Sequence, residues 1–387
     1  MAKKNETPKN KEIEISSEAS KNMLCALLNG YKETHYNFDM SPPTVITSGS
    51  LTLDSVVTIK TGTTLRMGGP AEVGKTSQAL LFAHNYMQTM PKAKTVYINA
   101  EAKFPKELEG RTGMKFVFSG DQWDYNTVFV LESNVFDTIC DILANLLKIT
   151  KENGEHLCII IDSVDMLTLA GNLEKKISDG KKPAGVNYLT KELFRRISPQ
   201  IRAFNALMIM ITQYAATFSL EQYAKEPPAL MEGNNTHALN HQASYALYYR
   251  PRYGGSYILE TPKEKPDPQT NKILGVYAKI DVRKSSSDNT GYTIEVPIAK
   301  GRVGNCVWTE KEVADMCIAY QLATGAAWLT FDGQILKEAK EAGVEIKEKI
   351  NGINKLYEYL SEQKDVCNWL KEKVSSITKM RLQLMEK

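Results

Sequence analysis

The stretch "GPAEVGKT", residues 69 to 76, constrains the fold more than any other part of the sequence. Gly69, Gly74, Lys75 and Thr76 follow the pattern G-x-x-x-x-G-K-[S/T], and the helix-forming run "SQALLFAHNYM" comes directly after them. Small residues let backbone amides curl around phosphate oxygens, and the N-terminus of the following helix adds its dipole. The sequence therefore predicts a strand, a phosphate-binding loop and a helix, in an α/β core that binds a nucleotide.

A second motif supplies the residue types that a magnesium ion needs. Lys75 is expected to reach the β- and γ-phosphates, and the hydroxyl of Thr76 is expected to bind Mg²⁺. Asp162 ends the apolar run "LCIIID", at the carboxyl end of a buried strand, where a further magnesium contact belongs. The alternative is that Asp162 only terminates its strand. The predicted cofactors are ATP and Mg²⁺, and the predicted cofactor-binding residues are Gly69, Pro70, Gly74, Lys75, Thr76 and Ser77.

Two further polar residues follow predicted strands at the same edge of the sheet. Glu101 comes after "TVYIN" (95–99), which makes it a candidate general base or water-positioning residue rather than a solvated surface residue. Gln213 ends "ALMIMITQ" (206–213), where its amide is in place to sense the γ-phosphate; a simple turn residue is the alternative.

Short β-rich runs alternate with helical stretches between about residues 45 and 300, which is typical of a parallel sheet covered on both faces. The runs 276–284 and 292–298, separated by polar turn residues, predict an antiparallel pair that extends this sheet. The predicted domains are 1–44, with a lysine-rich tail to about residue 16 and a helix capped by Ser16 or Ser17; 45–304, the ATPase core; and 305–387, a small C-terminal α+β lobe.

Composition excludes several classes of protein. The net charge of +3 is too small to indicate a nucleic-acid partner by itself, so any basic surface must be local. Six scattered cysteines form no CxxC pair, and Cys158 lies in an apolar run as a reduced core thiol. The charged N-terminus has no apolar signal-peptide core, and no stretch reaches the roughly 18 to 20 apolar residues that cross a bilayer. A cytoplasmic protein without a membrane partner is expected.

Several stretches, in motif order over about residues 45 to 345, resemble the bacterial RecA recombinase family and its phage members. They are "VITSGSLTLDSVV", "GPAEVGKT", "YINAEAKF", "IIIDSVDML", "MIMITQ", "ELFRRISPQIRAFNALM", which is closest to the phage recombinases, and "ATGAAWLTFDGQILKEA". The resemblance implies a RecA-type P-loop ATPase core. It also implies ATP-dependent filaments on single-stranded DNA, pairing of that strand with homologous double-stranded DNA, and strand exchange. The helix at Ser17–Leu28 resembles the family's polymerisation helix, which packs on the next subunit.

Positions that match the family's motifs carry its catalytic roles as expectations. Glu101 matches the catalytic Glu, Gln213 the switch between ATP and DNA, and Lys284 the first of two lysines that reach a neighbour's ATP. Ser286 replaces the second lysine, and Arg283 is a candidate substitute. Pro105 stands where the family has an Asp on the adenine side.

Two segments are candidates for DNA binding. Between residues 181 and 202 the sequence has six cationic residues and one acidic residue, Glu192. The cationic residues are Lys181, Lys182, Lys191, Arg195, Arg196 and Arg202. This cluster is either a phosphate-backbone contact or a solvated helix face. Pro199 predicts a break in its helix.

The second segment, after Gln213, predicts a long loop that matches the family's second DNA-binding loop. Phe218 and Tyr223 would stack on bases, or else pack the loop itself, and Gly233, Asn234 and Asn235 would bring amides to phosphates. Two other functions stay open: a RecA-fold hexameric helicase, and a degenerate filament protein that binds ATP but hydrolyses it poorly.

Overall fold

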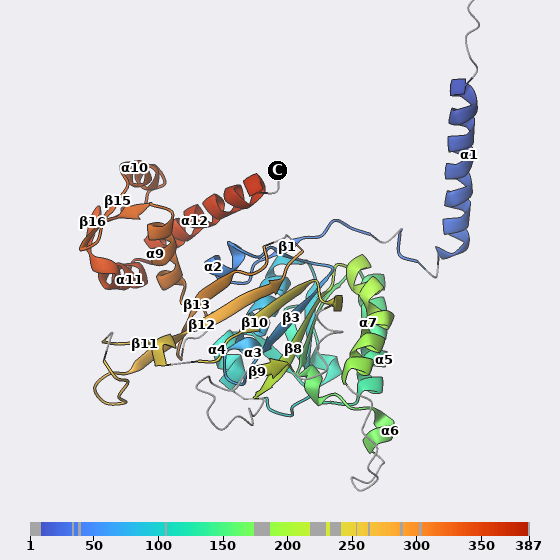
Figure 1. The fold of residues 1–387 in the computed structure, drawn as a ribbon, viewed down its shortest axis with the longest axis horizontal. Helices are drawn as coiled ribbons and strands as arrows, with labels where there is room; N and C mark the ends of the chain where they lie inside the picture. Colours follow the sequence, from blue (N-terminus) through green and yellow to red (C-terminus); the bar gives the residue numbers. More distant parts are fainter. Residues whose placement is uncertain are drawn as a thin grey trace, which may run out of the picture. The chain divides into compact units, whose positions relative to one another are not determined.

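The computed structural model describes residues 9–32, 35–37, 40–104, 107–173, 186–216, 230–232, 241–252, 254–261, 264–286, 289–301 and 304–385 (Figure 1). Residues 1–42 and residues 43–387 form two compact units. The first unit contains α1 (Lys9–Gly30). This helix begins before Ser17, so the predicted cap at Ser16 or Ser17 is wrong. Lysine and glutamate, which dominate the first turns, are good helix formers.

The second unit is built on a large mixed sheet. Eleven strands of the described residues join it, in the order β11-β12-β10-β3-β8-β7-β4-β6-β5, with β13 beside β12 and β9 beside β8. The strands are β3 (Thr63–Gly69), β4 (Ala93–Asn99), β5 (Lys115–Val117), β6 (Thr127–Leu131), β7 (His156–Asp162), β8 (Leu207–Ala216), β9 (Leu230–Glu232), β10 (Tyr245–Tyr249), β11 (Tyr257–Leu259), β12 (Ile273–Lys284) and β13 (Thr293–Ala299). The predicted α/β class with a mostly parallel central sheet is confirmed at this level.

Strand direction decides where side chains can meet. From β10 to β5 every neighbouring pair along the path is parallel, so the carboxyl ends of these strands lie at one edge of the sheet. Beyond β10 the sheet continues through β12 and β13, which are antiparallel to each other as the sequence predicted. The ends of β3, β4, β7 and β8 thus provide a common surface for a ligand.

The C-terminal lobe has its own small sheet and its own buried cluster. It consists of α9 (Thr309–Ala319), β14 (Ala323–Thr324), β15 (Trp328–Phe331), α10 (Gly333–Glu341), β16 (Lys349–Asn351), α11 (Gly352–Glu362) and α12 (Lys364–Met385). Glu312 of α9 accepts hydrogen bonds from the Ser50 hydroxyl and, at 2.9 Å, from the amide of Leu51. These bonds tie the lobe to the start of α2 (Leu51–Asp54).

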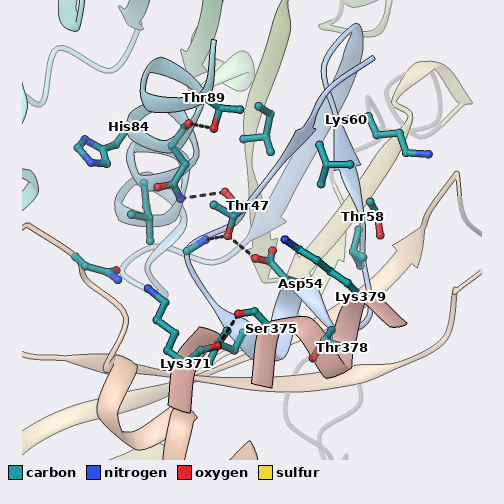
Figure 2. Close-up of a pocket in the computed structure, with 18 of the residues that line it drawn as sticks. Thr47, Asp54, Thr58, Lys60, His84, Thr89, Lys371, Ser375, Thr378 and Lys379 are labelled. Carbon is teal, nitrogen blue, oxygen red and sulfur yellow. Dashed lines mark hydrogen bonds between the residues drawn. The ribbon is translucent and has the colours of Figure 1, made fainter. Parts of the chain in front are cut away.

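A two-stranded sheet lies beside the core, formed by β1 (Val45–Ile46) and β2 (Ile59–Lys60). Together with α2, α3 and α12 it borders a large cavity (Figure 2).

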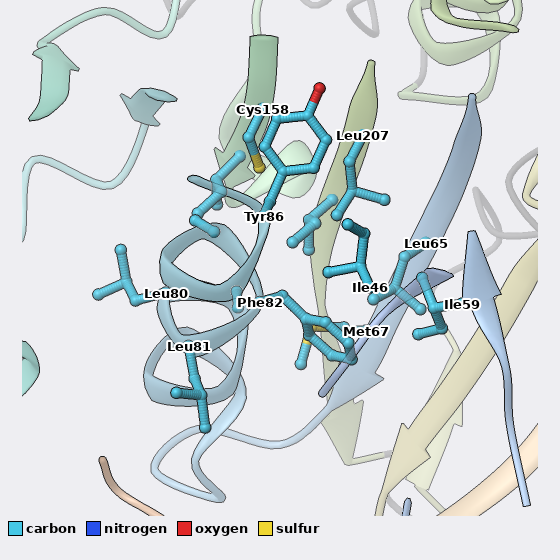
Figure 3. Close-up of a cluster of buried hydrophobic side chains, with 14 of the residues drawn as sticks. Ile46, Ile59, Leu65, Met67, Leu80, Leu81, Phe82, Tyr86, Cys158 and Leu207 are labelled. Carbon is cyan, nitrogen blue, oxygen red and sulfur yellow. The ribbon is translucent and has the colours of Figure 1, made fainter. Parts of the chain in front are cut away.

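Two separate apolar cores cover the two faces of the main sheet. The α-helices that follow the strands of this sheet are α3 (Lys75–Thr89), α4 (Glu107–Thr112), α5 (Phe136–Glu152), α6 (Ala170–Leu173) and α7 (Val186–Ala203). Successive side chains of a strand point to opposite faces of the sheet, so each central strand contributes to both cores. In β8, Ile209 packs with α3 on one face, while Met208 and Met210 pack with α5 and α7 on the other. In the first core Tyr86 of α3 lies beside Cys158 and Leu207, and Phe82 extends toward Met67 (Figure 3).

Two predictions about local structure are corrected. Pro199 lies inside α7, which continues through it, so the predicted break is wrong. Leu193, Phe194, Ile197 and Ile201 are buried against the sheet, and this packing outweighs the hydrogen bond that a proline removes. The segment after Gln213 is also more regular than expected, because β8 runs on to Ala216 and pairs with β9 in antiparallel fashion.

Candidate nucleotide-binding site

The loop that follows β3 depends on two glycines with unusual backbone angles. Gly69 has φ of 152°, and a Cβ there would lie 2.4 Å from the carbonyl oxygen of Tyr249. Gly74 has φ of 99° and forms the N-cap of α3. Because side chains are strained at such angles, the glycines of the predicted motif are required by the loop itself. The loop ends at the N-terminus of a fifteen-residue helix, which favours anions.

Lys75 is held across the loop rather than extended into solvent. Its side chain is buried, and its ammonium group donates a 2.9 Å hydrogen bond to the Gly69 carbonyl and a second bond to the Pro70 carbonyl. Burial lowers the pKa of Lys75 to about 8, against the opposing effect of Asp162 and two further carboxylates. A phosphate group in the loop would offset this cost of burial with a charge-assisted bond.

Thr76 and Asp162 lie together as the sequence predicted. The Thr76 hydroxyl donates a 2.7 Å hydrogen bond to Asp162 Oδ2, and the Tyr97 hydroxyl donates a 2.8 Å bond to the same oxygen. Burial raises the pKa of Asp162, while these two hydrogen bonds lower it. A hydroxyl beside a carboxylate is an oxygen-only donor set that suits Mg²⁺.

This donor pair fits magnesium rather than a protein-caged metal. Among the residues that the structure describes, no group of three or more His, Cys, Asp or Glu side chains is placed to hold a metal ion. Mg²⁺ is usually bound by one or two protein groups, with substrate phosphates and water completing its shell. Thr76 and Asp162 would hold the ion, which would neutralise phosphate charge when bound.

Ser77, two residues after Lys75 on α3, lines a small cavity. The cavity has a volume of about 20 Å³ and is also lined by Leu80, His84 and Leu108. It is too small for a nucleobase as it stands. Pro105, which replaces the Asp of the resembled family, lies outside the described residues.

The ends of β4 and β8 meet through their polar residues. Gln213 Nε2 donates a hydrogen bond to Glu101 Oε1, and the backbone amide of Gln213 donates a 2.6 Å bond to Asp165 Oδ2. Register pairs Gln213 with Gly69, the first residue of the phosphate loop. The two candidate catalytic residues predicted from separate strands are therefore in direct contact, beside the loop.

Two residues of the site were not predicted from the sequence. Tyr97 fixes the orientation of the Asp162 carboxylate, and Asp165 binds the backbone of Gln213. Asp165 lies three residues after Asp162 in "DSVDML", so a second acid just beyond a buried strand was an available signal. Tyr97 gave no such signal, because an aromatic residue inside a strand is most often part of the core.

A row of aromatic and cationic side chains runs from Gln213 toward β12. The ring of Tyr214 lies 4.8 Å from that of Tyr248, and the Arg283 guanidinium lies 4.0 Å from the Tyr248 ring centre. A Cβ on Gly68 would lie 2.7 Å from the Tyr214 ring, so this glycine makes room for the ring. The row spans β8, β10 and β12, and it crosses β3, the strand before the loop, which lies between β8 and β10.

Lys284 lies on β12, separated from the phosphate-loop strand by β10. Its ammonium group donates a 2.8 Å hydrogen bond to the His241 carbonyl, and burial lowers its pKa. Ser286, which stands in place of the family's second lysine, donates a 2.6 Å hydrogen bond to the Tyr245 hydroxyl. Neither residue belongs to the group of charged side chains around Lys75, which consists of Asp162, Glu101 and Asp165.

The predicted DNA-binding residues fall mostly outside the described residues, namely Lys181, Lys182, Phe218, Tyr223, Gly233, Asn234 and Asn235. Arg195 and Arg196 are described. The Arg195 side chain is 75% exposed and lies 3.9 Å from Glu192. Arg196 binds Glu192 at 3.0 Å and lies 3.9 Å from Asp141 of α5, so it joins α7 to α5.

Comparison with known proteins adds no relative: no protein-family model matches the sequence, and no curated protein matches it. Within the described residues, every helix is too short or too polar to cross a membrane.

Proposed function

We propose that this protein is a RecA-like recombinase, a DNA-dependent ATPase that assembles on single-stranded DNA and pairs it with a homologous duplex. The observation that carries the proposal is the position of Gln213. Its amide contacts Glu101 and its backbone contacts Asp165, both beside the phosphate loop. The same strand, β8, continues to Ala216 at the start of the predicted DNA-binding segment.

In this proposal the phosphate site supplies binding and hydrolysis of ATP. Lys75 neutralises the terminal phosphates, while Thr76 and Asp162 hold the magnesium ion. Glu101 positions the attacking water or removes its proton. Before that step its carboxylate must exchange the amide of Gln213 for water, so the two residues act in sequence.

Gln213 then acts as the switch between the two ligands. When a γ-phosphate offers a better acceptor, the amide leaves Glu101, and the end of β8 shifts with it. The shift at the end of β8 passes to its partner β9, and these two strands flank residues 217–229 of the predicted DNA-binding segment. Linkage requires DNA to strengthen ATP binding by the same factor as ATP strengthens DNA binding.

Self-association belongs to the same proposal. Met23, Leu24 and Leu27 are exposed on α1, as expected of a helix that packs on a neighbouring subunit. Lys284, which is remote from the Lys75 cluster of its own chain, would act on the nucleotide of the neighbour. Mixing the Lys284→Ala and Glu101→Gln variants should then restore part of the turnover, because each chain supplies what the other lacks.

The test is ATP turnover with and without single-stranded DNA. Wild type should be stimulated by DNA, and less so at high salt. Gln213→Ala should keep a basal rate that DNA does not raise, whereas Gln88→Ala, at an exposed position on α3, should behave as wild type.

If single-stranded DNA does not change the ATP turnover rate of wild type, the proposed recombinase function is contradicted. Negative-stain images of the protein with single-stranded DNA distinguish the proposed recombinase from the two other functions. The proposal predicts filaments, a helicase would give rings, and filaments with negligible turnover would indicate the degenerate protein.

A further inference from the structure

A cavity of about 1010 Å³ lies between the ATPase core and the last helix of the chain. Its walls come from β1, β2 and α2, from the outer face of α3, and from α12 (Figure 2). The volume is at the upper end of the range of about 300–1,000 Å³ that is typical of small-molecule sites. None of the residues predicted to bind nucleotide, magnesium or DNA is among the described residues that line this cavity.

The lining combines aliphatic walls with hydroxyl groups. The aliphatic residues are Val45, Ile46, Leu51, Val57 and Leu81. Hydroxyls come from Thr47, Thr58, Thr89, Thr112, Ser375 and Thr378. Among the described residues, the lining includes no Phe, Tyr or Trp, so the cavity offers no platform on which a nucleobase would stack.

Two lysines of α12 bring positive charge to this cavity. Lys371 and Lys379 lie eight residues apart, which is about 12 Å along a helix, with Ser375 between them. In Figure 2 the Lys379 side chain extends from α12 toward Asp54. Within the described part of the chain, no carboxylate forms an ion pair with either ammonium group.

Asp54, the one acidic residue among the described residues of the lining, is already engaged by neutral donors. Asp54 accepts hydrogen bonds from the Thr47 hydroxyl and, at 2.8 Å, from the Ser48 amide. Burial raises the pKa of this carboxyl, while its hydrogen bonds from Thr47 and Ser48 and, as the smallest effect, the charge of Lys371 lower it. The two lysines therefore outweigh Asp54, and the cavity has a net positive lining.

We propose that this cavity binds a small organic anion with an aliphatic body, whose carboxylate or phosphate group is held by Lys371 and Lys379. The aliphatic walls bury the body of the ligand, and its charged head group lies beside the two lysines. A decyl chain with a terminal anion fits well within this volume.

The same cavity adjoins the small one beside Ser77. Leu81, His84, Thr112 and Gly304 line both. A ligand in the larger cavity would press on side chains that must move apart if a nucleobase is to enter the smaller one. Its binding should therefore change the affinity for ATP, and ATP should change its affinity by the same factor. This coupling rests on the proposed nucleotide site, but the binding of the anion does not.

The test is calorimetric titration of the full chain with decanoate, decyl phosphate and the neutral 1-decanol. One anion should bind with one-to-one stoichiometry, more tightly than the alcohol, and whichever anion binds more tightly identifies the head group. Combining Lys371→Met with Lys379→Met should weaken that anion at least tenfold. The matched control is Lys347→Met with Lys349→Met, two exposed lysines elsewhere in the lobe, which should leave binding unchanged.

A second variant removes the space instead of the charge. Ser375→Phe places a ring in the cavity from a half-buried position and should abolish binding while the melting temperature shows that the chain is folded. The site is contradicted if neither anion binds at millimolar concentration, if decanol binds as tightly, or if the lysine variant binds as wild type does. An anion that binds without changing ATP affinity would overturn the coupling alone.

Discussion

The phosphate-loop site and the junction with the C-terminal lobe both bury a charged residue, but they surround it differently. Lys75 is influenced by three carboxylates, those of Asp162, Glu101 and Asp165. Glu312 is surrounded by neutral donors, the Ser50 hydroxyl and the amides of Leu51 and Thr52. Burial accordingly raises the pKa of Glu312 to about 7, so this carboxylate becomes neutral at mildly acidic pH.

Lys75 thus has the surroundings expected of a group that binds a phosphate in the proposed function, whereas Glu312 joins two parts of the fold. A lysine whose own bonds go to two backbone carbonyls can exchange them for phosphate oxygens. The Glu312 carboxylate accepts three hydrogen bonds from groups of its own chain, and no ligand is expected to replace them. Its protonation is therefore expected to change only the stability of the fold.

The largest effect is expected at Lys75. Replacing it with methionine removes the only side-chain cation in the loop, and ATP affinity should fall on the order of 10³-fold, as when one partner of a buried charge pair is lost. Equilibrium binding of a fluorescent ATP analogue measures this loss. Lys115→Met, at an exposed site on β5, should bind as wild type does; equal affinity for Lys75→Met would remove the lysine from the phosphate site.

The next effect is a pH dependence at the lobe junction. The folded-state pKa of Glu312 is about 7 and its ordinary value is 4.5, so folding takes up a proton between these limits. Stability should rise by up to about 3 kcal/mol as pH falls from 8 to below 4.5, and this gain should be absent in Glu312→Gln.

Urea unfolding of wild type and Glu312→Gln at several pH values measures the difference directly. Asp54, Asp162 and Asp315 also have raised pKa values, but they are present in both proteins and cancel. Glu345→Gln, at an exposed site, is the control. A difference between the two proteins that stays constant with pH would contradict the account of this junction.

A smaller effect is expected where the aromatic row crosses the phosphate-loop strand. Gly68→Ala places a Cβ 2.7 Å from the Tyr214 ring, and the displacement should cost about 1–3 kcal/mol in unfolding free energy. Gly120→Ala meets nothing within 4 Å and should change stability by under about 0.5 kcal/mol. If the ring is the obstacle, Gly68→Ala should cost less in a Tyr214→Ala background; an equal cost would place the strain elsewhere.

The smallest effect on stability is expected for an exposed charge. Arg196 pairs with Glu192 on the surface of α7, so Arg196→Met should change the unfolding free energy by less than about 1 kcal/mol. If Arg196 also contacts a DNA phosphate, the salt dependence of single-stranded DNA binding should decrease by about one charge. An unchanged salt slope would assign this arginine to the contact between α7 and α5 alone.

The sequence predicted those parts of the site that depend on strand order and strand ends. Long apolar runs identified β7 and β8, and the polar residue at the end of each run was then expected at the common carboxyl edge. Thr76 and Asp162 do meet there, as do Glu101 and Gln213. The glycine pattern likewise predicted a loop that the backbone angles require.

Packing between distant segments gave no comparable signal. Tyr97 and the row through Tyr214 and Tyr248 look like ordinary core aromatics until their neighbours are known. The cavity beside α12 is lined by segments more than 300 residues apart in the sequence, so no local sequence pattern predicts it. The helix α7 passes through Pro199 because its apolar face is buried on the sheet, and local propensity does not include that contribution.

In the proposed function the nucleotide site and a DNA-binding surface are energetically coupled through Gln213. The most direct test measures ATP affinity of the Glu101→Gln variant, in which hydrolysis should be slow, with and without saturating single-stranded DNA. The account predicts that DNA tightens ATP binding at least fivefold, that ATP tightens DNA binding by the same factor, and that adding Gln213→Ala removes both effects. ATP affinity that is the same with and without DNA would contradict it.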